Sequence, residues 1–231
     1  MNATAASSFS CVHIVGCGLL GTSMGLALAQ RGVTVTLEDA SPAAIDLARD
    51  YGAGHPRTDA SPAPSLVIVA TPPDVVGAVV TECLQLFPEA TVIDVASVKN
   101  QIYSEIHGET DRFVGTHPMA GRERGGAVAA RSDLFTGRPW VLCEGEESRR
   151  ADVREFVREL GAIPIDMDAA EHDEAVAAIV AKLDDWIARA RTETAFDFYA
   201  RILTLDRVRN RMIGRLGAET PDVLDEFLNM A

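Results

Sequence analysis

A glycine-rich turn near the N-terminus constrains this chain more than any other feature. We predict a short buried strand at residues 12–15, and the segment that follows it, at 16–21, has the pattern GxGxxG. A helix with no breaker except Gly25 comes next, and a second predicted strand at 33–37 ends in two acidic residues. A strand, a glycine turn, a helix and an acidic strand end form the full context of a dinucleotide-binding unit.

Each residue type in this turn has a physical role. Gly16 allows the tight turn, Gly18 lets the backbone approach a pyrophosphate, and Gly21 lets the helix pack against the strand. Leu19 and Leu20 open the helix, whose N-terminal N–H groups and partial positive charge favour phosphate. We therefore expect these five residues to bind a cofactor. The alternative is a structural turn without a ligand.

The acidic residues after the second strand predict which dinucleotide binds. A carboxylate about 20 residues beyond the turn accepts hydrogen bonds from the adenosine ribose hydroxyls. We expect Asp39 to do this, with Glu38 as the second candidate. No arginine follows them closely, which disfavours a 2′-phosphate and favours NAD over NADP.

Apolar strands alternate with helices up to about residue 167. This alternation predicts an α/β fold with a Rossmann-like, doubly wound, mostly parallel sheet covered on both faces. From residue 168 onward no strand is predicted, and apolar residues recur at helical spacing. We expect an NAD-binding domain at 1–167 and a C-terminal all-helical region at 168–231. The predicted strands are 12–15, 33–37, 66–70, 91–95, 113–115, 140–143 and 162–165.

Two further strand ends carry candidate site residues. Ala70, Thr71 and Pro72 offer small groups and a rigid turn where a cofactor ribose would pass. Ser97 and Lys99 place a hydroxyl and an ammonium at the sheet edge. Ligands of doubly wound sheets bind outside the carboxyl ends of the strands, so we expect all five at the site. Ser97 can also serve simply as a helix N-cap.

His117 is the candidate general base. It follows a predicted strand directly, Pro118 restricts its backbone, and a neutral imidazole can accept a proton near pH 7. The loop after it carries Arg122 and Arg124, whose guanidinium groups suit carboxylate recognition. By contrast, we expect His172 to be a capping or surface residue.

Composition excludes several classes of partner. The chain has 21 Lys and Arg against 34 Asp and Glu, a net charge of -13, so a nucleic-acid partner is not expected. No signal peptide and no apolar run of membrane-spanning length is evident, and the four cysteines show no CxxC spacing, which indicates reduced, buried thiols and a cytoplasmic location. No set of His, Cys, Asp and Glu has metal-ligand spacing.

Taken together, these motifs resemble the prephenate dehydrogenase family of tyrosine biosynthesis. The resemblance covers about residues 10–180, and its most specific block is His-Pro-Met-Ala-Gly-Arg-Glu at 117–123. It implies that His117 is the catalytic histidine and that Ser97 orients it near the nicotinamide. It also implies that Arg122 and Glu123 shape or gate the substrate pocket, and Lys99 is a further candidate for substrate binding.

The resemblance implies NAD-dependent oxidative decarboxylation of the small molecule prephenate to 4-hydroxyphenylpyruvate. A base removes the ring hydroxyl proton as hydride leaves the same carbon, CO₂ departs, and the ring becomes aromatic. Arogenate is an alternative substrate. Another acid dehydrogenase of the 6-phosphogluconate dehydrogenase type is a second alternative, although the block at 115–123 argues against it.

The sequence departs from the family after residue 180. The family continues with a Ser-His-x-Pro run and a helical dimerisation domain, and neither is evident here. Residues 181–231 instead resemble a helical segment of the large subunit of AddAB-type helicase–nucleases, too short to carry a helicase or nuclease site. We expect this region to cover apolar surface or to mediate self-association as a homodimer. The remaining alternative is an NAD-binding module without turnover.

Overall fold

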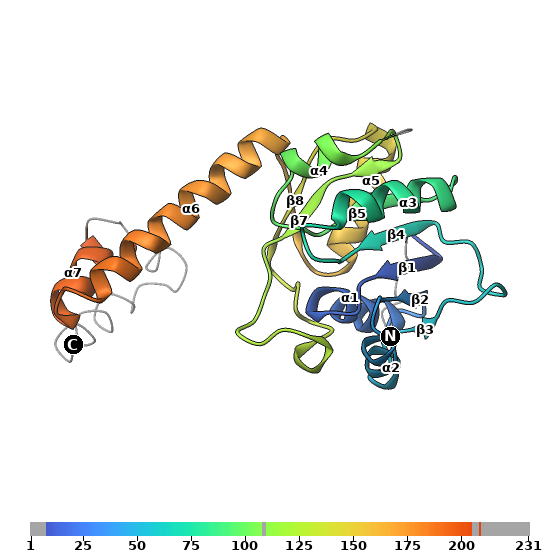
Figure 1. Cartoon of the computed structure of the whole chain (residues 1–231), viewed down its shortest axis with the longest axis horizontal. Coiled ribbons are helices and arrows are strands. Elements are labelled where there is room, and N and C mark those ends of the chain that lie inside the picture. Colours follow the sequence, from blue (N-terminus) through green and yellow to red (C-terminus); the bar gives the residue numbers. More distant parts are fainter. Residues whose placement is uncertain (1–7, 108–109, 205–207, 209–231) are drawn as a thin grey trace, which may run out of the picture. The chain divides into compact units, whose positions relative to one another are not determined.

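The computed structural model describes residues 8–107, 110–204 and 208 (Figure 1). The chain forms two compact units, Met1–Glu174 and Ala175–Ala231. The first contains every strand of the described residues and every candidate site residue.

A six-stranded parallel sheet forms the centre of the first unit. Its strand order is β3-β2-β1-β4-β5-β6, so the order reverses between β1 and β4, as in a doubly wound sheet. The predicted Rossmann-like class is confirmed. Strand β3 was not predicted, because it has only two residues, one of them proline. The strands are β1 Cys11–Val15, β2 Thr34–Glu38, β3 His55–Pro56, β4 Leu66–Val69, β5 Thr91–Asp94 and β6 Phe113–Val114.

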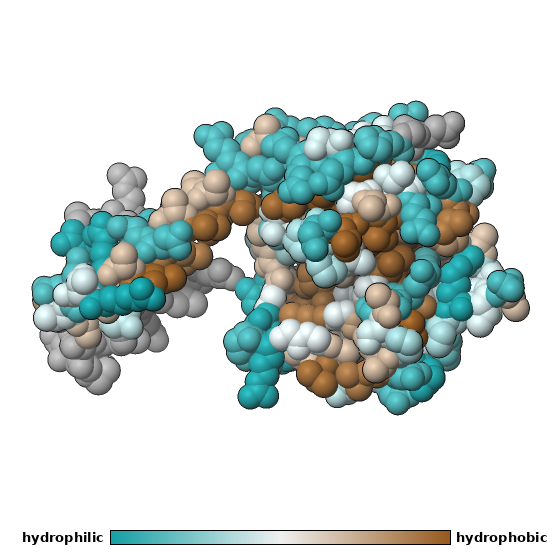
Figure 2. Space-filling view, in the orientation of Figure 1, coloured by the Kyte–Doolittle hydropathy of each residue, from teal (hydrophilic) through white to brown (hydrophobic). Residues whose placement is uncertain are grey.

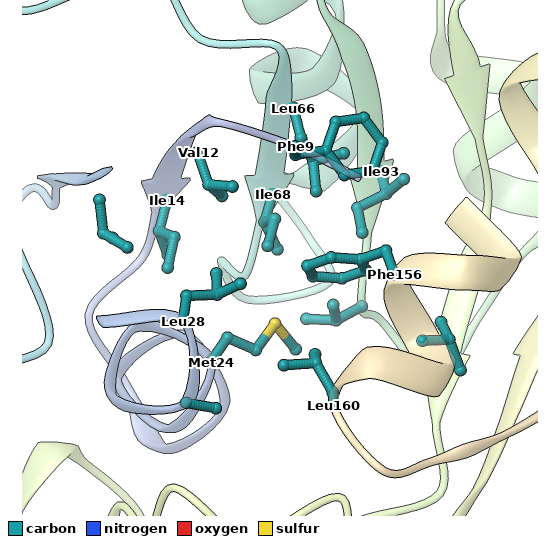
Figure 3. Close-up of a cluster of buried hydrophobic side chains, with 14 of the residues drawn as sticks. Phe9, Val12, Ile14, Met24, Leu28, Leu66, Ile68, Ile93, Phe156 and Leu160 are labelled. Atoms are coloured by element: carbon teal, nitrogen blue, oxygen red, sulfur yellow. The ribbon is translucent and has the colours of Figure 1, made fainter. Parts of the chain in front are cut away.

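Helices cover both faces of this sheet. Side chains of successive strand residues point to opposite faces, so Leu66 and Ile68 pack with helices α1 (Leu19–Ala29) and α5 (Glu147–Glu159), as Figure 3 shows. Val67 and Val69 face the opposite way and pack with α3 (Val76–Leu86) and α4 (Asn100–Glu105). Helix α2 (Pro42–Asp50) follows β2, and Ser41 caps it by accepting a hydrogen bond from the N–H of Ala44.

A second, three-stranded sheet, which the sequence did not predict, follows the parallel sheet. Strands β7 (Thr116–Pro118), β8 (Pro139–Leu142) and β9 (Ile163–Asp166) form it, with β7 antiparallel to β8 and β8 parallel to β9. The physical reason lies at Thr116, whose N–H donates to the Asp94 carboxylate at 3.0 Å instead of continuing the ladder of β6. His117 therefore lies within β7 and not in a loop after a strand. The loop after β7 contains one 3₁₀ turn among its described residues, η1 (Ala127–Ala129).

The C-terminal region is helical where it is described. Helix α6 (Ala169–Ala190) begins in the first unit and continues into the second, and α7 is Ala195–Thr204. Apolar side chains of α6 are exposed, which gives the brown surface along this helix in Figure 2; they are Ile179, Val180, Leu183 and Ile187. Residues 205–207 and 209–231 of the expected helical region lie outside the described residues. Within the described ranges, no helix is long and apolar enough to cross a membrane.

Candidate functional site

The glycine turn has a backbone that side chains would disrupt at two positions. Gly16 has φ +106°, and a Cβ built on it would lie 2.4 Å from the Ala70 carbonyl oxygen. A Cβ on Gly21 would lie 1.9 Å from the Gly16 carbonyl oxygen. Glycine is therefore required at both, for the tight turn and for the close packing of α1.

Gly18 differs, because its own surroundings in the protein are open. No protein atom lies within 4 Å of where its Cβ would be. Gly18 is also the N-cap of α1, where no side chain accepts a hydrogen bond from the helix N–H groups. An open glycine at an uncapped helix N-terminus suits an anionic group such as a pyrophosphate.

A cavity of about 770 Å³ adjoins this turn. It runs from the glycine turn past the ends of β2 and β4 to α3, and its lining includes Gly16, Gly18, Asp39, Ala70, Thr71 and Pro72. The hydroxyl of Thr71 is buried and has no hydrogen-bond partner among the described residues. A sugar hydroxyl bound in the cavity would satisfy it, so the residues fit a nucleotide.

The two acidic residues after β2 have different surroundings. Asp39 accepts hydrogen bonds from the N–H groups of Cys17 at 2.7 Å and Ser41 at 2.8 Å, so it ties the glycine turn to the start of α2. The Glu38 side chain is 60% exposed and lies 3.2 Å from Nε2 of buried His13. Both acids line the cavity, so either carboxylate can reach a ribose there.

Sequence reasoning missed His13, which also lines the cavity. Its Nδ1 lies 2.9 Å from Oγ1 of Thr36, its partner in the register of β1 and β2. Burial lowers the pKa of this ring. The signal available in the sequence was a histidine on a strand otherwise composed of apolar residues.

The structure corrects the expected substrate role of Lys99 and the capping role considered for Ser97, whereas the expected place of Ser97 beside the cofactor stays a prediction. The Lys99 side chain is fully buried and forms an ion pair with the equally buried Asp94, so its ammonium is not presented to a substrate. Burial raises the pKa of Asp94, and Lys99 and the N–H groups of Thr116 and Ala96 oppose that rise. Ser97 is exposed and is not the cap of α4, which begins after Lys99. No hydrogen bond joins Ser97 to His117 in the described structure.

His117 is instead joined to His172. Its Nδ1 lies 2.9 Å from Nε2 of His172, whose Nδ1 lies 2.8 Å from Oδ1 of Asp173. His172 is 1% exposed, so the expectation of a capping or surface residue was wrong. Burial, followed by His172 and Lys99, lowers the pKa of His117 to about 4. The imidazole is therefore neutral at pH 7, as a general base requires.

In the part of the chain that the structure describes, no hydrogen bond or ion pair joins Arg122 or Glu123 to this histidine pair. Arg122 donates from Nη1 to the Ala129 carbonyl oxygen at 3.1 Å, and Glu123 is exposed. Their expected role at a substrate pocket stays a prediction.

Comparison with known proteins identifies the family. Residues 24–165 match the model described as the prephenate dehydrogenase nucleotide-binding domain. The chain belongs to the prephenate dehydrogenase family. The matched segment begins just after the glycine turn, so it leaves out β1, and it includes the later strands of both sheets as far as Ile165. The match shows that this chain contains the nucleotide-binding domain of a family of NAD-dependent oxidoreductases. The cavity beside the glycine turn agrees with this, because its residues fit a nucleotide.

Several prephenate dehydrogenases are similar to this chain. It is 35% identical over 219 residues to the probable prephenate dehydrogenase NovF of Streptomyces niveus, covering 91% of this chain and 58% of that protein. The crystal structure of prephenate dehydrogenase from Aquifex aeolicus matches with a TM-score of 0.65 at 26% identity, over 77% of this chain and 71% of the other. A structure of the A. aeolicus enzyme with hydroxyphenyl propionate and NAD+ has a TM-score of 0.67 at 22% identity, covering 96% and 95%, which shows the shared fold.

These relatives also bear on the C-terminal region. The chain spans little more than half of the length of NovF, at 58%. Because that alignment covers 91% of this chain, it extends into residues 181–231. The resemblance of this region to a helicase–nuclease segment stays a prediction.

Proposed function

We propose that this chain binds NAD in the cavity beside the glycine turn and oxidatively decarboxylates prephenate to 4-hydroxyphenylpyruvate. The observation that carries the proposal is the placement of His117, a neutral imidazole tethered to the carboxyl end of β5 through the contact between Thr116 and Asp94. Dinucleotides lie across the carboxyl ends of the strands in doubly wound sheets. The glycine turn after β1 would hold the diphosphate, and the nicotinamide would extend toward β5.

In the proposed reaction, the cofactor and His117 have separate roles. Bound NAD would supply the hydride acceptor. Nε2 of His117, which has no hydrogen-bond partner among the described residues, would take the proton of the substrate hydroxyl. Loss of CO₂ follows because formation of the aromatic ring drives it, and the phenolate oxygen that results would take the proton back from His117. The protein mainly orients the substrate and the base.

Two alternatives remain for the experiment to separate. Arogenate would undergo the same reaction, and a chain spanning 58% of its relative NovF could bind NAD without turnover. Calorimetry with NAD, together with NADH formation from prephenate and from arogenate, distinguishes the three. Turnover of prephenate supports the proposal, turnover of arogenate alone favours the second substrate, and binding without turnover favours the module.

We also propose a cytoplasmic location and, for the exposed apolar side chains of α6, self-association.

Replacement of Gly18 by alanine tests the cofactor site. Because the new methyl group meets no protein atom within 4 Å, we expect the variant to fold with unchanged thermal stability. The methyl group would occupy the space for the diphosphate, so NAD affinity should fall by about tenfold or more, or about 1.4 kcal/mol. Calorimetric titration measures this. Gly125→Ala is the matched control, because its Cβ is equally unobstructed. Equal NAD affinity of the Gly18 variant and the wild type would contradict the assignment.

The pH dependence of turnover tests the base. Since the pKa of His117 is lowered to about 4, the neutral base predominates at all pH values above about 5. We expect kcat/KM for NADH formation to stay level from pH 8 down to about 5 and to decline below that, as the ring gains its proton. Circular dichroism at each pH separates this decline from acid unfolding. A decline centred near pH 6.5, the ordinary histidine value, would contradict the assignment.

A further inference from the structure

The interior side of His117 contains a chain of titratable groups that the proposed reaction does not use directly. The His117 and His172 rings meet edge to face, with centroids 5.1 Å apart. Their nitrogens lie 2.9 Å apart, and the second nitrogen of His172 lies 2.8 Å from Asp173. The contacts therefore run from His117 through His172 to Asp173, and His172, the middle residue, is only 1% exposed. A buried imidazole needs hydrogen-bond partners within the protein, and His172 has one on each ring nitrogen.

The carboxylate at the end fixes the direction of every hydrogen bond in the chain. A carboxylate only accepts, so Nδ1 of His172 carries a proton and donates it to Asp173. In the neutral ring, Nε2 of His172 is then an acceptor, and Nδ1 of His117 must be the donor. The neutral His117 ring is left with an unprotonated Nε2. This is the tautomer that can take a proton from a substrate.

Asp173 is itself held in place. Its Oδ1 accepts the N–H of Lys99 at 2.9 Å, and its Oδ2 accepts the N–H of Asn100, also at 2.9 Å. Both N–H groups lie at the start of α4, just after β5, so the carboxylate is anchored to the strand end that also holds Thr116. Asp173 and the strand that carries His117 are therefore both hydrogen-bonded to the segment at the end of β5.

We infer that His172 and Asp173 are positioning residues for His117, which hold its ring in the base-competent tautomer. The Asp173 carboxylate also stabilises the imidazolium that forms on proton transfer. The inference rests on the proposed function of His117. After Nε2 of His117 takes the substrate proton, its Nδ1–H remains donated to His172, and the carboxylate of Asp173 lies behind that ring. The surroundings of His117 act in opposition, because burial, His172 and Lys99 lower its pKa while Asp173 raises it, and Asp94 pairs with Lys99. In a Ser-His-Asp triad, the aspartate similarly holds a histidine base in the correct tautomer and stabilises its imidazolium.

Nitrogen-15 NMR of the whole chain tests the tautomer without any substrate. At pH 7 we expect the wild-type His117 ring to carry its proton on Nδ1. In His172→Phe the acceptor is lost, and we expect the ring to populate the Nε2–H form. His172→Gln retains an acceptor oxygen for His117 and a donor for Asp173, so it should preserve the Nδ1–H form. A wild-type ring protonated on Nε2 would overturn the inference, even if His172→Phe failed to fold.

Kinetics provide the second readout. We expect His172→Phe to lower kcat by about 10- to 100-fold with the KM for NAD unchanged, and His172→Gln to recover most of the loss. Asp168→Ala is the structural control. It removes a carboxylate that accepts the Glu171 N–H at the start of α6, at 2.7 Å, and keeps the Asp168 carbonyl oxygen that accepts the His172 N–H at 2.9 Å. The control should lose thermal stability but retain the tautomer and kcat. Equal kcat for His172→Phe and wild type would overturn the inference, whereas an inactive wild type with the expected tautomer would refute only the proposed reaction.

Discussion

Replacement of His117 by asparagine should lower kcat/KM for NADH formation from prephenate by about 10²- to 10⁴-fold, the usual contribution of a positioned general base. The amide keeps a polar group of similar size but cannot take the substrate proton. NAD affinity and melting temperature should stay close to those of the wild type, because His117 does not line the cavity beside the glycine turn. Steady-state kinetics at pH 7, with calorimetry of NAD binding, measure both quantities.

The matched control for this variant is His55→Asn. His55 is exposed on the edge strand β3 and lies outside the cavity, so its replacement should leave kcat/KM unchanged. If the His117 variant kept at least half of the wild-type kcat/KM, His117 would not be the base, and the proposed reaction would need another residue.

Replacement of Lys99 by methionine should destabilise the fold by about 3–5 kcal/mol, because it leaves the Asp94 carboxylate buried without a counter-charge. Asp94 also accepts the N–H of Thr116 and of Ala96, so the support of the His117 strand would be disturbed. Urea denaturation followed by circular dichroism measures the free energy of unfolding.

A double variant, Lys99→Met with Asp94→Asn, separates charge from packing. The neutral amide removes the unpaired charge, so the double variant should be more stable than Lys99→Met alone. If Lys99→Met were as stable as the wild type, the pair would not be the buried support described above, and Lys99 would again be a candidate for substrate contact.

Much of the fold could be predicted from the sequence, because local periodicity carries it. Apolar runs bounded by turns predict β1, β2, β4 and β5, and the glycine spacing predicts the first turn and its helix. The division into two sheets could not be predicted in this way. It depends on the hydrogen bond from Thr116 to the side chain of Asp94, which joins residues 22 positions apart. Strand β7 has only three residues, too few for a periodic pattern.

The candidate site was predicted less completely, for the same reason. The residues of the glycine turn are local in sequence. Gly16 and Gly18 line the cavity, and the backbone leaves no room for a Cβ at Gly16 or Gly21. The burial of Lys99 depends on its pairing with Asp94, and the contact of His172 with His117 joins residues 55 positions apart. The His-Asp pair at 172–173 was visible in the sequence, but only the structure shows what it faces.

A crystal structure of the chain with NAD+ and a substrate analogue tests the central claim most directly. We predict that the diphosphate contacts the backbone from Cys17 to Leu20, and that the nicotinamide reaches the end of β5. Nε2 of His117 should then lie about 3 Å from the hydroxyl of the analogue, the range of a hydrogen bond. A nicotinamide ring on the far side of the turn, with His117 remote from both ligands, would contradict the account.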